Sequence, residues 1–201
     1  MDYYVIDLDG PNYRFLANLA KVVADLTDQS IDDLDVPDDE WGLNLTDWGL
    51  KDRTEFLIAY SLGVRYGDLL WEGEPADGAV QGWADLAARP DSYIHVVTAR
   101  TPFGSEAEAA EATNYWLAMN GLYYDHISFA HDKVPTVRNH IAFLDLDESD
   151  LRIMTIDDRA SNCQEFATAG WESYVYAFPS NTHLDLPRVS SMIEFAEITK
   201  S

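Results

Sequence analysis

The stretch YVIDLDGPNY, residues 4–13, is the part of the sequence that decides the fold. Its apolar run predicts a buried β-strand over residues 3–8, and the glycine and proline that follow predict a turn. Asp7 and Asp9 lie at the end of this run with one residue between them. Two neighbouring carboxylates repel each other, so a plain structural turn has little use for both. In an extended chain their side chains lean the same way, which indicates a shared chemical role.

Four further apolar runs have the length and the Val, Ile, Tyr and Phe content of buried strands. They are residues 93–99, 126–130, 152–157 and 173–178. Helical patterns lie between or after them, at residues 77–90, 105–121, 159–170 and 189–200. Strands that alternate with helices in this way are typical of an α/β fold, here a three-layer, Rossmann-like arrangement around a parallel sheet.

A long segment, residues 11–74, separates the first two strands by far more than one crossover connection needs. It contains two helical patterns, at residues 13–27 and 52–64, joined by an acidic loop. We therefore expect two units: an α/β core of residues 1–10 and 75–201, and a small helical cap of residues 11–74. The cap is expected over the C-terminal edge of the sheet, where open α/β sheets bind ligands.

The composition limits the partners of the protein. Its 201 residues include 36 acidic and 13 basic ones, and the resulting net charge of −23 disfavours binding to duplex nucleic acid. No run of about 18 apolar residues is present, so no membrane span is expected. The N-terminal residues lack the features of an export signal, and a single cysteine suits a reducing compartment, so we expect a cytoplasmic protein. The sequence leaves a homodimer open.

Polar residues follow four of the predicted strands at the point where each strand ends. They are Asp7 and Asp9, then Thr98, then Lys133, and finally the pair Asp157–Asp158. Because the carboxyl ends of parallel strands meet at one edge of a sheet, we expect these side chains to lie together. Each residue alone is a weak signal in so acidic a chain, and only their coincidence at one edge indicates a site.

The residue types at this edge point to phosphoryl transfer. Several carboxylates in one pocket raise each other's pKa unless a cation offsets them, and Lys133 alone is not enough. Mg²⁺ binds through one or two carboxylates together with a substrate phosphate. With that ion present, an aspartate can attack phosphorus and form an aspartyl-phosphate. Lys133 then offers a point charge, and Thr98 an uncharged hydroxyl donor, to the phosphoryl oxygens.

The order DLDG (7–10), VVTAR (96–100), HDK (131–133) and TIDDR (155–159) resembles the four motifs of the haloacid dehalogenase-like (HAD) superfamily. Asp at both 7 and 9 is the pattern of its phosphatases. Residues 71–87, read together with these motifs, are similar to the 5'(3')-deoxyribonucleotidase group. The resemblance implies an HAD-like fold with a small cap after the first motif, Mg²⁺ as cofactor, and hydrolysis of a small phosphomonoester, namely a (deoxy)nucleoside monophosphate.

The resemblance also implies a role for each residue that matches a motif. Asp7 would be the nucleophile and a Mg²⁺ ligand. Asp9 would be the general acid and then the base, with its backbone carbonyl on the metal. Thr98 would bind the phosphoryl group, and Lys133 would bind it too and stabilise its charge.

The remaining motif residues receive looser roles. One of Asp157 and Asp158 would bind Mg²⁺ directly and the other would support it; the sequence does not decide which. Ala99 and Arg100, next to Thr98, and Arg159, next to the late aspartates, are candidate substrate contacts.

The cap should select the substrate, and a nucleobase needs flat faces to stack on. Trp48 is the candidate contact, and Trp41, Trp71 and Tyr13 are further aromatic residues near or within the cap. The alternative is that these aromatic residues form the cap's own hydrophobic core.

Two other functions stay open at this point. One is a phosphatase that acts on another small phosphomonoester or on a nucleic-acid end. The other is a weakly active HAD-like binding protein, which Pro11 keeps open because family members usually have Thr or Val after the glycine, and proline removes a backbone N–H. The five histidines show no pair at metal-ligand spacing on one helix, so zinc is not expected.

Overall fold

The structure, a computed structural model, describes residues 1–36, 45–66, 69–101 and 105–200. Within them one six-stranded parallel sheet has the order β3-β2-β1-β4-β5-β6. The strands are β1 (Asp2–Ile6), β2 (Ser92–Thr98), β3 (His126–Phe129), β4 (Arg152–Asp157), β5 (Glu172–Tyr176) and β6 (Arg188–Val189). The predicted α/β class with a parallel sheet is confirmed.

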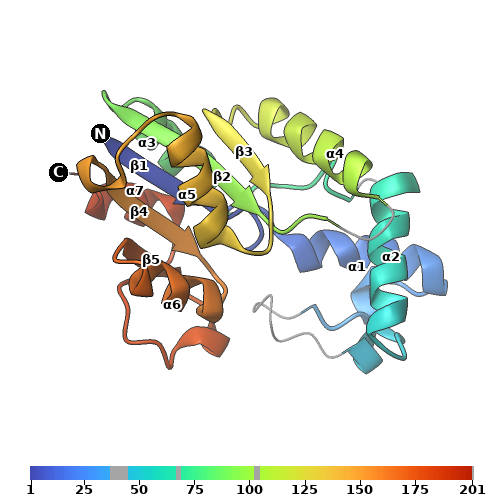
Figure 1. The fold of residues 1–201 in the computed structure, drawn as a ribbon. Coiled ribbons are helices and arrows are strands. Elements are labelled where there is room, and N and C mark those ends of the chain that lie inside the picture. The colour runs from blue at the N-terminus through green and yellow to red at the C-terminus, as the bar shows by residue number, and fades with distance from the viewer. Residues whose placement is uncertain (37–44, 67–68, 102–104, 201) are drawn as a thin grey trace.

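The α-helices form two layers around the sheet and a hairpin beyond its end (Figure 1). They are α1 (Phe15–Thr27), α2 (Arg53–Tyr66), α3 (Ala79–Ala87), α4 (Glu106–Met119), α5 (Lys133–Phe143), α6 (Ala160–Thr168) and α7 (Met192–Ile198). Short 3₁₀ turns occupy Ile31–Asp33, Leu45–Trp48, Glu148–Asp150 and Pro179–Asn181. No helix in the described ranges is both long and apolar enough to cross a membrane.

The sheet separates two hydrophobic cores because side chains alternate along a strand. On β1, Tyr4 and Ile6 pack with residues of α3, α4 and α7. Tyr3 and Val5 face the other side and pack with residues of α5 and α6. Covered on both faces, the central strands read as continuous apolar runs, which is why the sequence reveals them.

Helices α1 and α2 pack against each other beyond the C-terminal ends of the strands (Figure 1). The buried residues of this hairpin, such as Leu19, Val23 and Val64, belong to the same core cluster as Tyr4 and Ile6 of the sheet. The hairpin therefore shares a continuous apolar contact with one face of the α/β layers. The division into a core (1–10 and 75–201) and a cap (11–74) remains our proposal for the domain organisation.

Two elements were not expected from the sequence. Helix α5 begins at Lys133, carries Pro135 in its first turn, and has only Val137 and Ile141 among its buried apolar residues, so its pattern is weak. Proline is compatible with a first turn, where a backbone N–H needs no helical partner. Strand β6 has two residues and gives no periodic signal.

Candidate active site

Three carboxylates converge at the C-terminal edge of the sheet. Asp7 follows β1, Asp157 ends β4 and Asp158 follows it. Each of them offers an oxygen within 4.8 Å of the others, and all three residues are buried. Because β1 and β4 are adjacent parallel strands, the first and last motifs meet although they are far apart in sequence. We call these three residues, with Lys133, the carboxylate cluster.

Lys133 lies between two of these carboxylates. Its Nζ is 2.8 Å from Oδ1 of Asp7 and 2.7 Å from Oδ2 of Asp157, and its side chain is 3% exposed. The lysine is placed here because it begins α5, which follows β3 after a short loop. Burial disfavours the charged ammonium, but Asp157 and Asp7 more than offset this and raise the pKa of Lys133. The lysine is therefore a fixed positive charge.

One lysine does not balance three buried carboxylates. Burial, together with the charges of Asp157 and Asp9, raises the pKa of Asp7 to about 7, although Lys133 opposes the shift. Mg²⁺ prefers oxygen ligands and favours the ionised form of a carboxylate. The donor set at this edge, with its excess of negative charge, fits such an ion.

Asp157 is held by several donors. Its Oδ1 accepts the backbone N–H of Arg159 at 2.9 Å, and Nδ2 of Asn162 lies 3.1 and 3.0 Å from its two oxygens. With the bond from Lys133, both oxygens are engaged. Asn162, on the first turn of α6, was not expected as a site residue; a polar residue in the first turn after the motif is the signal that could have indicated it.

Asp158 lies against the first motif. A Cβ on Gly10 would stand 2.7 Å from Oδ2 of Asp158, so only glycine fits there, and its φ of +88° requires glycine as well. The amide of Asn181 donates to the backbone carbonyl of Asp158 at 2.8 Å. No local sequence pattern indicates Asn181, because it comes from a 3₁₀ turn well beyond the last motif.

The turn containing Pro11 is closed by its own backbone. Gly10 N donates to Tyr13 O at 3.0 Å, and the amides of Asn12 and Tyr13 both donate to Leu8 O, at 3.0 and 2.8 Å. Asn12 also donates from its side chain to the backbone carbonyl of Asp7 at 2.7 Å. Proline therefore lacks its N–H in a turn where the amides on either side already donate to carbonyl groups of the same turn.

Thr98 is the last residue of β2, which pairs with β1, the strand that leads to Asp7. Its side chain is fully buried, and its Oγ1 has no hydrogen-bond partner in the structure. Buried hydroxyls are almost always paired, so an unpaired one at a sheet edge is a reason to look for a ligand. That Thr98 binds a phosphoryl group stays a prediction.

Asp9 is the more accessible member of the first pair. Its side chain is 30% exposed, against 10% for Asp7. Arg100 binds it, with Nη2 2.6 Å from Oδ1. Asp9 therefore lies next to the carboxylate cluster with an ion pair of its own.

The expected substrate contacts fare differently. Arg159 is exposed next to the cluster, and Ala99 is half-buried after Thr98. Arg100 is fully buried and bound to Asp9, so the structure gives it no free face for substrate.

Trp48 is also fully buried, and its indole N–H donates to Asp35 O at 2.8 Å. Tyr13 is buried as well. Trp48 and Tyr13 both belong to the buried core cluster, as in the alternative of a cap core. Stacking of Trp48 on a base stays a prediction. Trp71 is half-buried, and Trp41 lies outside the described residues.

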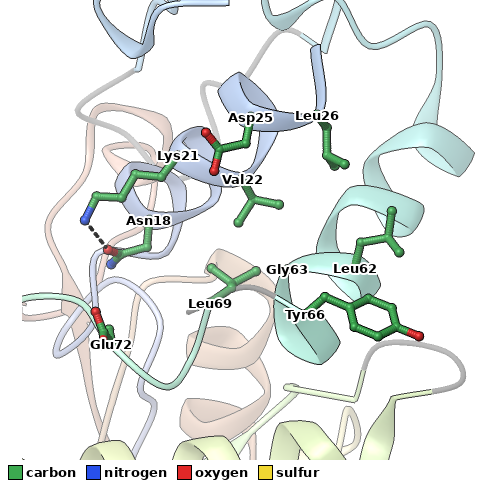
Figure 2. A pocket seen from close by; sticks show the side chains of 10 residues that line it. All are labelled: Asn18, Lys21, Val22, Asp25, Leu26, Leu62, Gly63, Tyr66, Leu69 and Glu72. Carbon is green, nitrogen blue, oxygen red and sulfur yellow. Dashed lines mark hydrogen bonds between the residues drawn. The ribbon is translucent and has the colours of Figure 1, made fainter. Parts of the chain in front are cut away.

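A pocket of about 320 Å³ lies between α1 and α2 (Figure 2). Val22, Leu62 and Leu69 give it apolar walls, and Lys21 Nζ donates to Asn18 Oδ1 at 3.2 Å on one side. None of its lining residues belongs to the motifs. The hollow in the helical hairpin is therefore separate from the carboxylate cluster.

No protein-family model matches the sequence, and no curated protein matches it. Solved structures do share its fold. A defluorinating L-2-haloacid dehalogenase is 11% identical, with a TM-score of 0.62 and coverage of 100% of this chain and 96% of that one. An HAD-superfamily hydrolase of subfamily IA from Geobacter sulfurreducens is 13% identical, with a TM-score of 0.60 and coverage of 100% and 97%.

A third similar structure is described as a predicted phosphoglycolate phosphatase from Haemophilus somnus. It is 15% identical, with a TM-score of 0.61 and coverage of 100% of this chain and 98% of that one. At these identities the likeness shows the fold alone. The chain therefore has the fold of HAD-superfamily hydrolases over its whole length.

Proposed function

We propose that this protein is a Mg²⁺-dependent phosphomonoester hydrolase that acts through an aspartyl-phosphate on Asp7. The observation that carries the proposal is the carboxylate cluster: three buried carboxylates around one lysine, beside the unpaired hydroxyl of Thr98. A fold needs no such excess of buried negative charge, which costs stability unless a cation joins it. The HAD fold and the four motifs support the same chemistry.

Asp7 and Asp9 would share the chemistry in two steps. An oxygen of Asp7 attacks phosphorus, the bond from phosphorus to the leaving oxygen breaks, and Asp9 gives that oxygen a proton. Water then attacks the phosphorus of the aspartyl-phosphate and passes a proton to Asp9, and the bond to Asp7 breaks to release inorganic phosphate. Lys133, fixed at Asp7, would face the phosphoryl oxygens, and the Thr98 hydroxyl would donate to one of them.

Mg²⁺, held by Asp7, Asp158 and the backbone carbonyl of Asp9, would neutralise charge on the phosphoryl group. We assign the direct contact to Asp158 and the supporting role to Asp157, because both oxygens of Asp157 already accept hydrogen bonds from Lys133, Arg159 and Asn162.

A small phosphomonoester is the proposed substrate, and a (deoxy)nucleoside monophosphate is the first candidate because residues 71–87 and the motifs resemble the deoxyribonucleotidase group. The burial of Trp48 and Tyr13 favours a second candidate, a phosphomonoester without a base. Dehalogenation is less well supported: a halide leaves without a proton, so it gives no role to Asp9 or to a metal-binding carboxylate set.

The test measures the release of phosphate, or of halide from a 2-haloacid, over a panel of substrates with MgCl₂ or with EDTA. The panel holds 5'- and 3'-nucleoside monophosphates, a nucleic-acid 3'-phosphate, phosphoglycolate, a sugar phosphate and a 2-haloacid. We expect Mg²⁺-dependent phosphate release that Asp7→Asn lowers by roughly 10⁴-fold and that Asp150→Asn, at an exposed site, leaves unchanged. Activity that survives in Asp7→Asn overturns the mechanism. If no nucleotide exceeds the sugar phosphate, the nucleotide assignment is wrong.

A further inference from the structure

Arg100 is a charged residue without any exposed surface. Its guanidinium makes three contacts with the Asp9 carboxylate: Nε lies 3.0 and 3.2 Å from the two oxygens, and Nη2 lies 2.6 Å from Oδ1. Nη1 lies 3.4 Å from the hydroxyl of Thr113 on α4. A planar guanidinium that contacts both oxygens fixes the direction of a carboxylate as well as its distance.

Aromatic rings hold the guanidinium in place. Its central carbon is 4.4 Å from the ring centroid of Tyr13 and 5.8 Å from that of Trp116, both fully buried. Cations over aromatic faces are stabilised when water is excluded. Arg100 thus has one arrangement available: packed on these rings and bound to Asp9.

The same rings connect Arg100 to the base of the helical hairpin. Tyr13 accepts the backbone N–H of Leu70 at its hydroxyl, 3.1 Å away, and Trp116 donates from its indole to Gly73 O at 2.9 Å. Leu70 and Gly73 lie on the segment that returns from the hairpin to α3. Asp9, Arg100 and this returning segment therefore form one packed unit.

We propose that Arg100 is the positioning residue of Asp9, which it holds in the orientation for proton transfer, and that it does not touch the substrate. The proposal rests on the proposed function, in which Asp9 protonates the leaving oxygen. Proton transfer requires the two heavy atoms to lie within hydrogen-bond reach, and a misplacement of about 1 Å costs on the order of 10²-fold in rate. The motif residue Arg100 thereby gains a role that its neighbour Thr98 does not share.

A comparison of two aryl esters distinguishes a positioning residue from a substrate contact and from a purely structural residue. Phenyl phosphate has a poorer leaving group than 4-nitrophenyl phosphate and depends more on a proton from Asp9. In Arg100→Lys, which keeps the charge and loses the fork, we expect kcat/KM for phenyl phosphate to fall about 10- to 100-fold. This ratio reports the step in which the leaving oxygen is protonated, and not the later hydrolysis of the aspartyl-phosphate that both esters share. The fall in kcat/KM for 4-nitrophenyl phosphate should be less than about fivefold.

Other outcomes contradict the proposal. A rise in KM with kcat unchanged makes Arg100 a substrate contact. An equal fall in kcat/KM for both esters shows no dependence on the leaving group and contradicts the positioning role. In an Asp9→Asn background, Arg100→Lys should change the remaining 4-nitrophenyl phosphate turnover by less than about twofold, because residues that act as a unit are not additive. A full effect in that background overturns the proposal.

A thermal unfolding cycle keeps the test independent of turnover. Asp9→Asn, Arg100→Gln and the double variant are compared with the unchanged chain, and the double variant should lower Tm by clearly less than the sum of the single shifts. Additive shifts contradict the pairing. If the unchanged protein hydrolyses neither these two esters nor any phosphomonoester of the panel with Mg²⁺, the proposed function fails, and this cycle alone then decides whether Arg100 fixes Asp9.

Discussion

Two polar clusters lie at this sheet, one buried and one partly buried, and their polar groups are satisfied in different ways. The histidine cluster consists of Tyr3, Tyr93, His95, His126, Ser128 and His140. His95 bonds Tyr3 Oη through Nδ1 at 2.8 Å and Ser128 Oγ through Nε2 at 2.9 Å. Tyr93 bonds His140 at 2.8 Å, and the His126 and His140 rings stack 3.7 Å apart. The sequence did not indicate that three histidines meet.

The carboxylate cluster is charged where the histidine cluster is neutral. Burial, with His140 and His126 beside it, lowers the pKa of His95 to about 3, so its network is made of uncharged groups. Both ring nitrogens of His95 have partners, so it is not a ready metal ligand. The carboxylate cluster instead keeps excess charge and stands beside an unpaired hydroxyl. A polar cluster whose groups satisfy each other's hydrogen bonds indicates a structural role. A cluster that leaves charge or a hydroxyl unsatisfied indicates a ligand site.

Lys133→Met should break the carboxylate cluster most severely. The change leaves Asp7 and Asp157 buried without their shared cation, and removal of one partner from a buried ion pair costs about 3–5 kcal/mol. Urea unfolding near neutral pH measures the loss. The matched control is Lys51→Met, because Lys51 is 84% exposed in its pair with Glu55 and should cost less than about 1 kcal/mol. Equal losses for the two variants would show that the buried lysine does not compensate the carboxylates.

Asp7→Asn should stabilise the protein in the absence of Mg²⁺. The pKa of Asp7 is raised to about 7, so between about pH 4 and 7 the unfolded chain has lost a proton that the folded chain still holds. Wild-type stability therefore falls as pH rises through this window and levels off above it. Asp7→Asn removes the decline and should gain roughly 2–3 kcal/mol at about pH 8. Unfolding at about pH 5 and 8 measures this; a variant less stable than wild type at the higher pH would contradict it.

The sequence predicted the carboxylate cluster because four motifs that are far apart in sequence each follow a parallel strand. The C-terminal ends of parallel strands lie at one edge of the sheet. Asp7, Thr98, Lys133 and the late aspartates lie at or next to strand ends, and topology alone brings them together. The central strands β1, β2 and β4 were visible as apolar runs that are buried on both faces. Nothing comparable marks the histidines, because His95 and His126 face each other across β2 and β3 while His140 comes from a helix with a weak pattern.

The sequence did not predict which partners the side chains of either cluster contact. Arg100 was expected to meet the substrate, and its burial against Tyr13 and Trp116 depends on how α4 and the hairpin base pack. Trp48 was expected to offer a face to a base, although a large apolar side chain is buried more often than not. Pattern predicts which residues share an edge, and packing then decides which of them remain open.

His95→Gln tests whether the histidine cluster is only structural. The change interrupts the bonds to Tyr3 and Ser128 and should cost about 1–2 kcal/mol near pH 8, with the turnover of any substrate unchanged. Because the pKa of His95 is lowered to about 3, the folded state gains stability as pH rises from about 3 to 6.5, which is opposite in sign to the effect of Asp7. The variant should lose that part of the slope in chemical unfolding; a loss of turnover at full stability would make the cluster functional.

Added Mg²⁺ should stabilise the folded protein, and this is the smallest of the four expected effects. It tests whether the carboxylate cluster, unlike the histidine cluster, binds a cation. An ion that binds only the folded state stabilises it by RT ln(1 + [Mg²⁺]/Kd), which is about 1.4 kcal/mol at ten times Kd. The rise in Tm should disappear in Asp158→Asn and persist in His95→Gln and in the exposed variant Asp150→Asn. A shift that all three variants retain would place the ion elsewhere on this acidic surface. Loss of the shift in Asp158→Asn alone would tie the excess negative charge of the carboxylate cluster to a cation, which is the property that the histidine cluster lacks.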